Sequence, residues 1–240
     1  MSFINQTQPI VIGVDSGHGN IKTANYHFPT AVISHDGEPT FKANLLQNKT
    51  VDYTYHGIAY QVEFVGADVF PQGFSAVAGS LREFRGVNML CDIGNGTMNV
   101  MYINNCRPVS SKCYTERYGV HQCMLATREA LTRRYQVDVD DSVIEQVFRF
   151  NEADISGAYL TTIRESAAEY VDGIMRRLRE HGYDPRQMRL YVMGGGACLV
   201  KNFGRFDAER VTFHDDLCAT AKGYEALAVH KLHGRGGSIV

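Results

Sequence analysis

One arrangement occurs twice in this sequence: a short apolar strand ends at an aspartate, and a glycine-rich turn and a second strand follow. The first copy runs from residues 10–14 to Asp15, a turn over 16–20 and a strand over 21–26. The second runs from residues 87–90 to Asp92, a turn over 94–97 and a strand over 98–103. Short apolar runs bounded by glycines are typical of buried strands. The duplication predicts an α/β chain made of two related halves.

The first turn carries residue types that suit phosphate binding. Its residues are Gly17, His18, Gly19 and Asn20, and Lys22 follows on the next strand. Glycines let the backbone approach a ligand, and successive amide groups form an anion-binding nest. Asp15 suits the water shell that Mg²⁺ keeps. An ordinary hairpin with a surface lysine is the alternative.

The second turn repeats this chemistry with Asp92 followed by Gly94, Asn95, Gly96 and Thr97. A tight hairpin would again explain one such turn taken alone. Two aspartate-glycine hairpins in one chain point to a polyphosphate held from both sides, with Asp15 and Asp92 holding Mg²⁺ through water.

Two further segments fit a nucleotide site. Gly194, Gly195 and Gly196 separate an apolar strand over 190–193 from a helix over 198–203. A base or phosphate could lie on this backbone, although the segment lacks the lysine of a P-loop and could be a plain loop. Gln72 follows Pro71, and proline is favoured at the first helical position, which predicts a helix over 71–81. A glutamine there could orient an attacking water or cap its own helix.

Composition excludes several classes of protein. Hydrophobic residues make up 44% of the 240 residues, charged residues 21%, and the formal net charge is −2. This excludes a disordered chain and argues against direct nucleic-acid binding. No apolar run reaches the roughly 18 residues of a membrane span. The six cysteines lack C-x-x-C spacing and residues 1–9 lack signal-peptide features, so we expect reduced thiols in the cytoplasm.

The rest of the chain predicts strands, a hairpin and mainly helices. Strands are expected over 28–33, 108–114 and 211–213, a hairpin over 51–65, and helices over 41–46 and 217–232. Val120, Met124, Thr127 and Leu131 share one helix face, and Ser142 and Glu145 form a capping box. A long apolar stripe ends at Gly182; its members are Ile155, Tyr159, Ile163, Ala167, Tyr170, Ile174 and Leu178.

These segments, in this order, resemble the actin-like ATPase superfamily, and in particular the ParM/StbA plasmid-segregation type. The resemblance implies an α/β, actin-like (ribonuclease H-like) two-lobed fold. Its first lobe would be residues 1–85 with a closing helix over 217–232, its second residues 86–216, and 233–240 a flexible tail. The two turns would bind the phosphates of ATP or GTP with Mg²⁺, the three glycines would back the adenosine, and Gln72 would position the water.

The resemblance also implies slow hydrolysis, assembly into filaments, and a DNA-bound adaptor protein as partner, without direct contact to nucleic acid or membrane. Two other functions remain open. One is a small kinase of the same superfamily, similar to type III pantothenate kinase, for which Asp68 is the available acid. The other is a non-catalytic scaffold that has lost productive binding.

Two departures from the family pattern stand out. Asn99 stands where the second hairpin usually carries another aspartate, which removes one charge beside the phosphates. Only about ten residues, 31–40, replace a small subdomain, a helix and a core strand of the first lobe. A natural minimal form and an engineered deletion both fit this truncation. An unpaired strand in this lobe would invite self-association by strand pairing.

Overall fold

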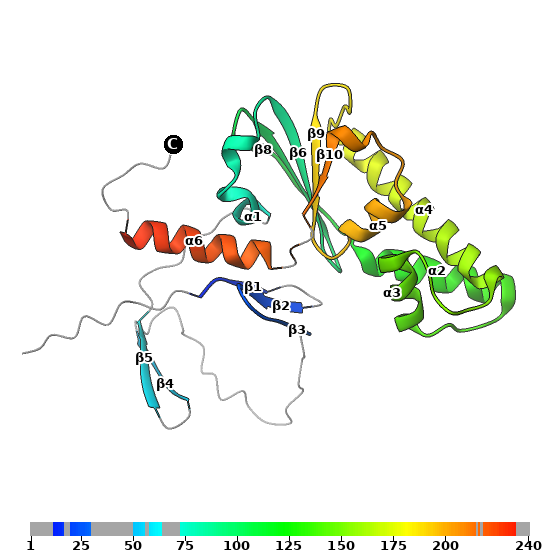
Figure 1. The fold of residues 1–240 in the computed structure, drawn as a ribbon, viewed down its shortest axis with the longest axis horizontal. Helices are drawn as coiled ribbons and strands as arrows, with labels where there is room; N and C mark the ends of the chain where they lie inside the picture. Colours follow the sequence, from blue (N-terminus) through cyan, green and yellow to red (C-terminus); the bar gives the residue numbers. More distant parts are fainter. Residues whose placement is uncertain are drawn as a thin grey trace, which may run out of the picture. The chain divides into compact units, whose positions relative to one another are not determined.

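The computed structural model describes residues 12–16, 20–29, 50–55, 58–63, 73–214, 216 and 218–233 (Figure 1). The chain divides into two compact units, one of Met1–Thr30 with Pro71–Val240 and one of Ala31–Phe70. The expected helix over 41–46, and the tail from residue 234 onward, lie outside the described residues. The division into lobes at residue 85 stays a prediction.

A five-stranded mixed sheet forms the centre of the larger unit, in the order β10-β9-β6-β7-β8. β6 (Val87–Ile93), β7 (Met98–Asn104) and β8 (Arg107–Glu116) are antiparallel neighbours. On its other side β6 runs parallel to β9 (Arg189–Met193), which runs parallel to β10 (Val211–Phe213). The strands expected from the sequence in this region are confirmed.

Helices cover both faces of this sheet (Figure 1). One face packs on α2 (Val120–Tyr135), α3 (Asp141–Phe150), α4 (Gly157–Glu180) and α5 (Ala197–Phe203). The other packs on α1 (Phe74–Ala78) and the short 3₁₀ turn Leu81–Glu83. A second 3₁₀ turn, Ala208–Arg210, precedes β10. Because both faces are covered, β6 is buried from Asn88 to Ile93 and β9 from Leu190 to Met193, without alternating exposed residues.

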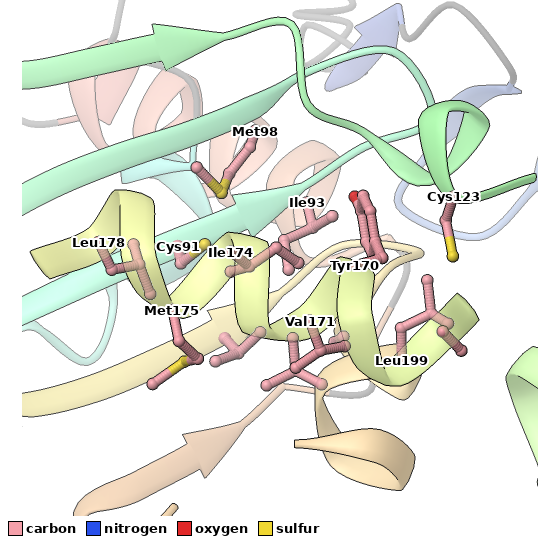
Figure 2. Close-up of a cluster of buried hydrophobic side chains, with 14 of the residues drawn as sticks. Cys91, Ile93, Met98, Cys123, Tyr170, Val171, Ile174, Met175, Leu178 and Leu199 are labelled. Atoms are coloured by element: carbon pink, nitrogen blue, oxygen red, sulfur yellow. The ribbon is translucent and has the colours of Figure 1, made fainter. Parts of the chain in front are cut away.

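The side chains of β6 alternate between two apolar clusters. Met89, Cys91 and Ile93 join the larger cluster, whereas Leu90 joins the smaller one beneath α1. Figure 2 shows the larger cluster, where α4 lies across the strands. The apolar stripe expected on this helix is confirmed from Ile163 to Leu178, both fully buried, whereas Ile155 precedes the helix.

A three-stranded antiparallel sheet lies at the start of the chain, formed by β1 (Val14–Ser16), β2 (Asn20–Thr23) and β3 (His27–Pro29). The expectation that its first strand is buried is wrong for the described residues, because Ile12 and Val14 are 66% and 52% exposed. Among the described strands, β1 pairs with β2 alone. Gly13, between Ile12 and Val14, packs closely on α6 (Ala219–His233). A Cβ atom added to Gly13 would lie only 2.0 Å from Ala221 O.

Two expected helix starts need correction. Gly73 has a left-handed φ of 84°, so α1 begins at Phe74 and not at Pro71. The residue that caps α3 is Asp140, whose carboxylate accepts from Ser142 N at 2.8 Å. Ser142 therefore lies inside the helix, and the expected capping box is absent. An aspartate two residues earlier in the chain caps equally well.

The smaller unit contains the hairpin of β4 (Thr50–Tyr55) and β5 (Ile58–Glu63). Tyr55 pairs with Ile58, so the connection falls at residues 56 and 57, and the expected hairpin is confirmed. None of the helices in the described part of the chain is long and apolar enough to cross a bilayer.

Candidate functional site

The carboxyl ends of three parallel strands meet at one edge of the five-stranded sheet. β6, β9 and β10 end there at Ile93, Met193 and Phe213. In open α/β sheets ligands bind outside such ends. The second predicted turn and the three glycines both follow strands of this set, so the topology alone brings them to the same edge.

Asp92 lies at the end of β6, and only 8% of its surface is exposed. Two glycines with positive φ press against it. A Cβ on Gly194 (φ 82°) would lie 2.5 Å from Asp92 Oδ1, and one on Gly73 (φ 84°) would lie 3.5 Å from Asp92 Cβ. A side chain at Gly194 would crowd the carboxyl group, whereas a Cβ at Gly73 would be in ordinary van der Waals contact with Asp92. The absence of a side chain at Gly194 therefore leaves the room that the Asp92 side chain occupies.

Asp15, Lys22 and Asp92 interact electrostatically. Lys22 Nζ donates to Asp15 Oδ2 at 3.1 Å. Burial raises the pKa of Asp92 to about 6; Lys22 partly offsets this rise, and Asp15 adds to it. The charged groups expected from the two aspartate hairpins thus lie within reach of one another in the larger unit.

The turn after β6 is fixed on α2. Gly94 N donates to Thr97 O, while Gly94 O and Asn95 O accept from Val120 N and His121 N at 3.0 and 2.9 Å. Gly119 allows this approach, because a Cβ there would lie 2.4 Å from Asn95 O. Among the described residues, the amides of Asn95 and Gly96 donate to no backbone carbonyl. They are therefore available to an anion.

The three glycines lie against the end of β6. Gly196 N donates to Ile93 O at 2.9 Å, and a Cβ on Gly196 would meet Ile93 Cγ2 at 2.3 Å. An added Cβ on Gly195 would meet nothing within 4 Å. Gly194 and Gly196 are thus required by packing, whereas Gly195 leaves open space beside the backbone.

Several predicted site residues cannot be placed. Gly17, His18, Gly19 and Gln72 lie outside the described residues, as does the side chain of Asn20. Sequence reasoning assigned no role to Gly73 or Tyr224. Burial raises the pKa of Tyr224 on α6; neighbouring Ser75 partly offsets this rise, and the charges of Asp15 and Asp92 add to it. Gly73 stands beside Gln72 in the sequence, but only the fold reveals its contact with Asp92.

The residues present suit Mg²⁺ held through water. The described residues contain no group of three or more side chains positioned to chelate a metal directly. Two carboxylates beside a candidate phosphate site would fit Mg²⁺, which retains most of its water and takes few protein ligands. All six cysteines are free, and burial strongly raises the pKa of the Cys91 thiol, which disfavours a thiolate ligand.

Comparison with known proteins defines the class of fold. A family model described as "Archaeal actin homologue MreB-like, C-terminal" matches residues 90–203. The fold is similar to the crystal structure of Ta0583, an archaeal actin homologue in complex with ADP, with a TM-score of 0.68 and 17% identity. That match covers 92% of this chain and 100% of the other. The chain therefore has the actin-like fold.

ParM structures share this fold over a smaller part of their length. A non-polymerisable quadruple mutant of pCBH ParM matches with a TM-score of 0.56 and 17% identity, over 73% of this chain and 58% of that one. A 15-stranded ParM filament from Clostridium botulinum gives 0.55 and 15%, over 75% and 59%. No curated protein sequence matches the chain.

Proposed function

We propose that this chain binds a nucleoside triphosphate, ATP or GTP, together with Mg²⁺, and hydrolyses it slowly. The observation that carries the proposal is the meeting of Asp15, Lys22 and Asp92 in one electrostatic cluster, with Asp92 held against Gly194 at the carboxyl edge of the sheet. The similar archaeal actin homologue was crystallised with ADP, which supports a nucleotide as the ligand.

The charges of the cluster suit this ligand. In the free protein Lys22 is paired with Asp15, and Asp92 is a buried acid whose ionisation is opposed. Mg²⁺, when bound, would neutralise the carboxylates and the phosphate oxygens. Lys22 would then exchange Asp15 for a phosphate oxygen, and the amides of Asn95 and Gly96 would donate to the opposite side.

The remaining residues have distinct proposed roles. Gly17, His18, Gly19 and Asn20 bind phosphates from the first turn, and Gly94 and Thr97 complete the second. Gly194, Gly195 and Gly196 back the adenosine. Gln72 orients the water that attacks the γ-phosphate in line, so catalysis consists of positioning and charge stabilisation.

We further propose that the chain self-associates and serves plasmid segregation of the ParM/StbA type in the cytoplasm, through a DNA-bound adaptor protein. The filament form of a ParM protein with this fold supports the self-association. The nucleotide would lie between a first lobe over residues 1–85, closed by the helix over 217–232, and a second over 86–216.

Phosphate release from ATP and GTP, measured with Mg²⁺ and no added acceptor, tests the proposed hydrolysis. We expect slow release that Lys22→Met abolishes. Lys112→Met, on β8 where Lys112 lies over the Tyr102 ring, is the matched control and should not change it. Transfer of the γ-phosphoryl group to an added hydroxyl acceptor, with release of nucleoside diphosphate and no free phosphate, would favour a small kinase. Absence of both binding and release would favour a non-catalytic scaffold.

A further inference from the structure

Three polar side chains stand in a row across the strands that carry the second turn. Asp92 on β6 is directly opposite Asn99 on β7, and Asn99 is directly opposite Thr115 on β8. Side chains directly opposite one another in an antiparallel pair share a face, with Cβ atoms about 4.5–5.5 Å apart. The row therefore runs from the candidate metal carboxylate to the edge of the sheet.

Asn99 is buried, and only one of the two polar atoms of its side-chain amide has a hydrogen-bond partner among the described residues. Only 7% of its surface is exposed, and its Oδ1 accepts from Thr115 Oγ1 at 2.8 Å. Its Nδ2 is buried without a hydrogen-bond partner among the described residues. A buried donor left without a partner costs about 1–3 kcal/mol. Such a group is expected to acquire a partner in the working state of the site.

The orientation of the amide indicates that partner. The Thr115 hydroxyl holds Oδ1 on the β8 side, so Nδ2 faces the β6 side, where Asp92 is the neighbour. The reverse orientation would bring the amide oxygen towards a carboxylate, which is electrostatically unfavourable. An aspartate at this position would place two carboxylates opposite each other, which is destabilising. An amide supplies a donor without adding charge.

We propose that Asn99, oriented by Thr115, is a positioning residue for Asp92 that holds the carboxylate in the orientation that binds the water shell of Mg²⁺. This inference rests on the proposed nucleotide function. Groups that orient metal-binding carboxylates typically contribute 10–100-fold to metal affinity. The same range is expected here for the Mg²⁺ requirement of nucleotide binding.

The test titrates Mg²⁺ at a fixed concentration of a fluorescent ATP analogue. Asn99→Ala should raise the Mg²⁺ concentration for half-maximal binding about tenfold, and Thr115→Val should raise it in the same direction. Thr115→Ser keeps the hydroxyl and should remain at the wild-type value, as should Thr212→Val, exposed on β10. Nucleotide affinity in EDTA should be unchanged in all variants, which a folding defect would not allow.

A second readout needs no nucleotide. In ¹⁵N-labelled protein the side-chain amide signal of Asn99 should move when Asp92→Ala removes its neighbour and should keep its position in Asp172→Ala. Wild-type binding with unchanged Mg²⁺ midpoints in Asn99→Ala and Thr115→Val would overturn this inference alone. A wild-type chain that binds no nucleotide would overturn the proposed function and this inference together.

Discussion

At the scale of single residues, Asp92 combines a charge with burial. Only 8% of the Asp92 surface is exposed, its carboxyl group lies close to Gly194, and desolvation is the main cause of its raised pKa. Burial therefore opposes ionisation in the free protein, and a bound cation would favour the ionised form. A group under this constraint is a candidate for a functional role.

Replacing this acid with a neutral isostere should stabilise the free protein at neutral pH. The folded pKa of about 6 exceeds the reference value of 3.8, so the folded state holds the proton more tightly than the unfolded state. The resulting loss of stability develops as pH rises from about 4 to about 6 and is complete above that range. Asp92→Asn should remove up to about 3 kcal/mol of destabilisation above pH 6 and nothing below pH 4.

Urea unfolding between pH 4 and pH 8 measures this difference. Asp172→Asn, at an exposed position on α4, serves as the control and should follow the wild-type curve at every pH. A constant offset between Asp92→Asn and wild type across the whole range would contradict the account, because a pH-independent effect cannot arise from a titrating group.

At the scale of elements, the loop after β9 contains three consecutive glycines with different requirements. Gly194 needs a left-handed backbone and leaves no room for a Cβ beside Asp92 Oδ1 and Ile93 O, both 2.5 Å away. Gly195 has ordinary φ and open space. Within this loop, Gly194 is therefore required by packing, whereas the open space at Gly195 is available for the proposed ligand.

Alanine substitutions at these two neighbours should act differently. Gly194→Ala should lower the free energy of unfolding by about 2 kcal/mol or more, because strain and a steric clash coincide. Gly195→Ala should stay within about 0.5 kcal/mol of wild type, yet lower nucleotide affinity because its methyl group would occupy the proposed adenosine position. Thermal melts and nucleotide titrations separate the two effects. Equal stability losses in both variants would refute this assignment.

The elements with a strong periodic pattern could be predicted from the sequence. The strands of the five-stranded sheet and the buried stripe of α4 could be predicted from residue spacing alone. They pack into one continuous hydrophobic core, which imposes a regular pattern of apolar residues. The burial of the first strand could not, because exposure of Val14 depends on which elements cover it. The contact of Gly73 with Asp92 joins segments about twenty residues apart through α1, and no local pattern encodes it.

At the scale of the whole molecule, two groups of three antiparallel strands differ in their surroundings. The first array is β1-β2-β3, and the second array is β6-β7-β8 within the five-stranded sheet. β6 has β9 on its second edge and Cys91, next to Asp92, is fully buried. In the described part of the chain β1 has no strand on its second edge, and Val14, next to Asp15, is 52% exposed. Unpaired strand edges invite pairing with another chain.

We therefore expect self-association through the first array. Val14→Lys should reduce the apparent mass in light scattering at high protein concentration, because a charged residue on an edge strand opposes strand pairing. Leu125→Lys, at a similarly exposed apolar position on α2, should not. A protein that is monomeric at every concentration, or ATP-dependent filaments that persist unchanged in Val14→Lys, would contradict this expectation.

The most direct test of the central claim is a calorimetric titration of the protein with ATP and Mg²⁺. We expect binding by the wild-type chain and loss of the Mg²⁺-dependent part of the affinity in Asp92→Ala, with the fold retained. Asp172→Ala should bind as wild type does. Unchanged Mg²⁺-dependent affinity in Asp92→Ala would contradict the assignment of this site.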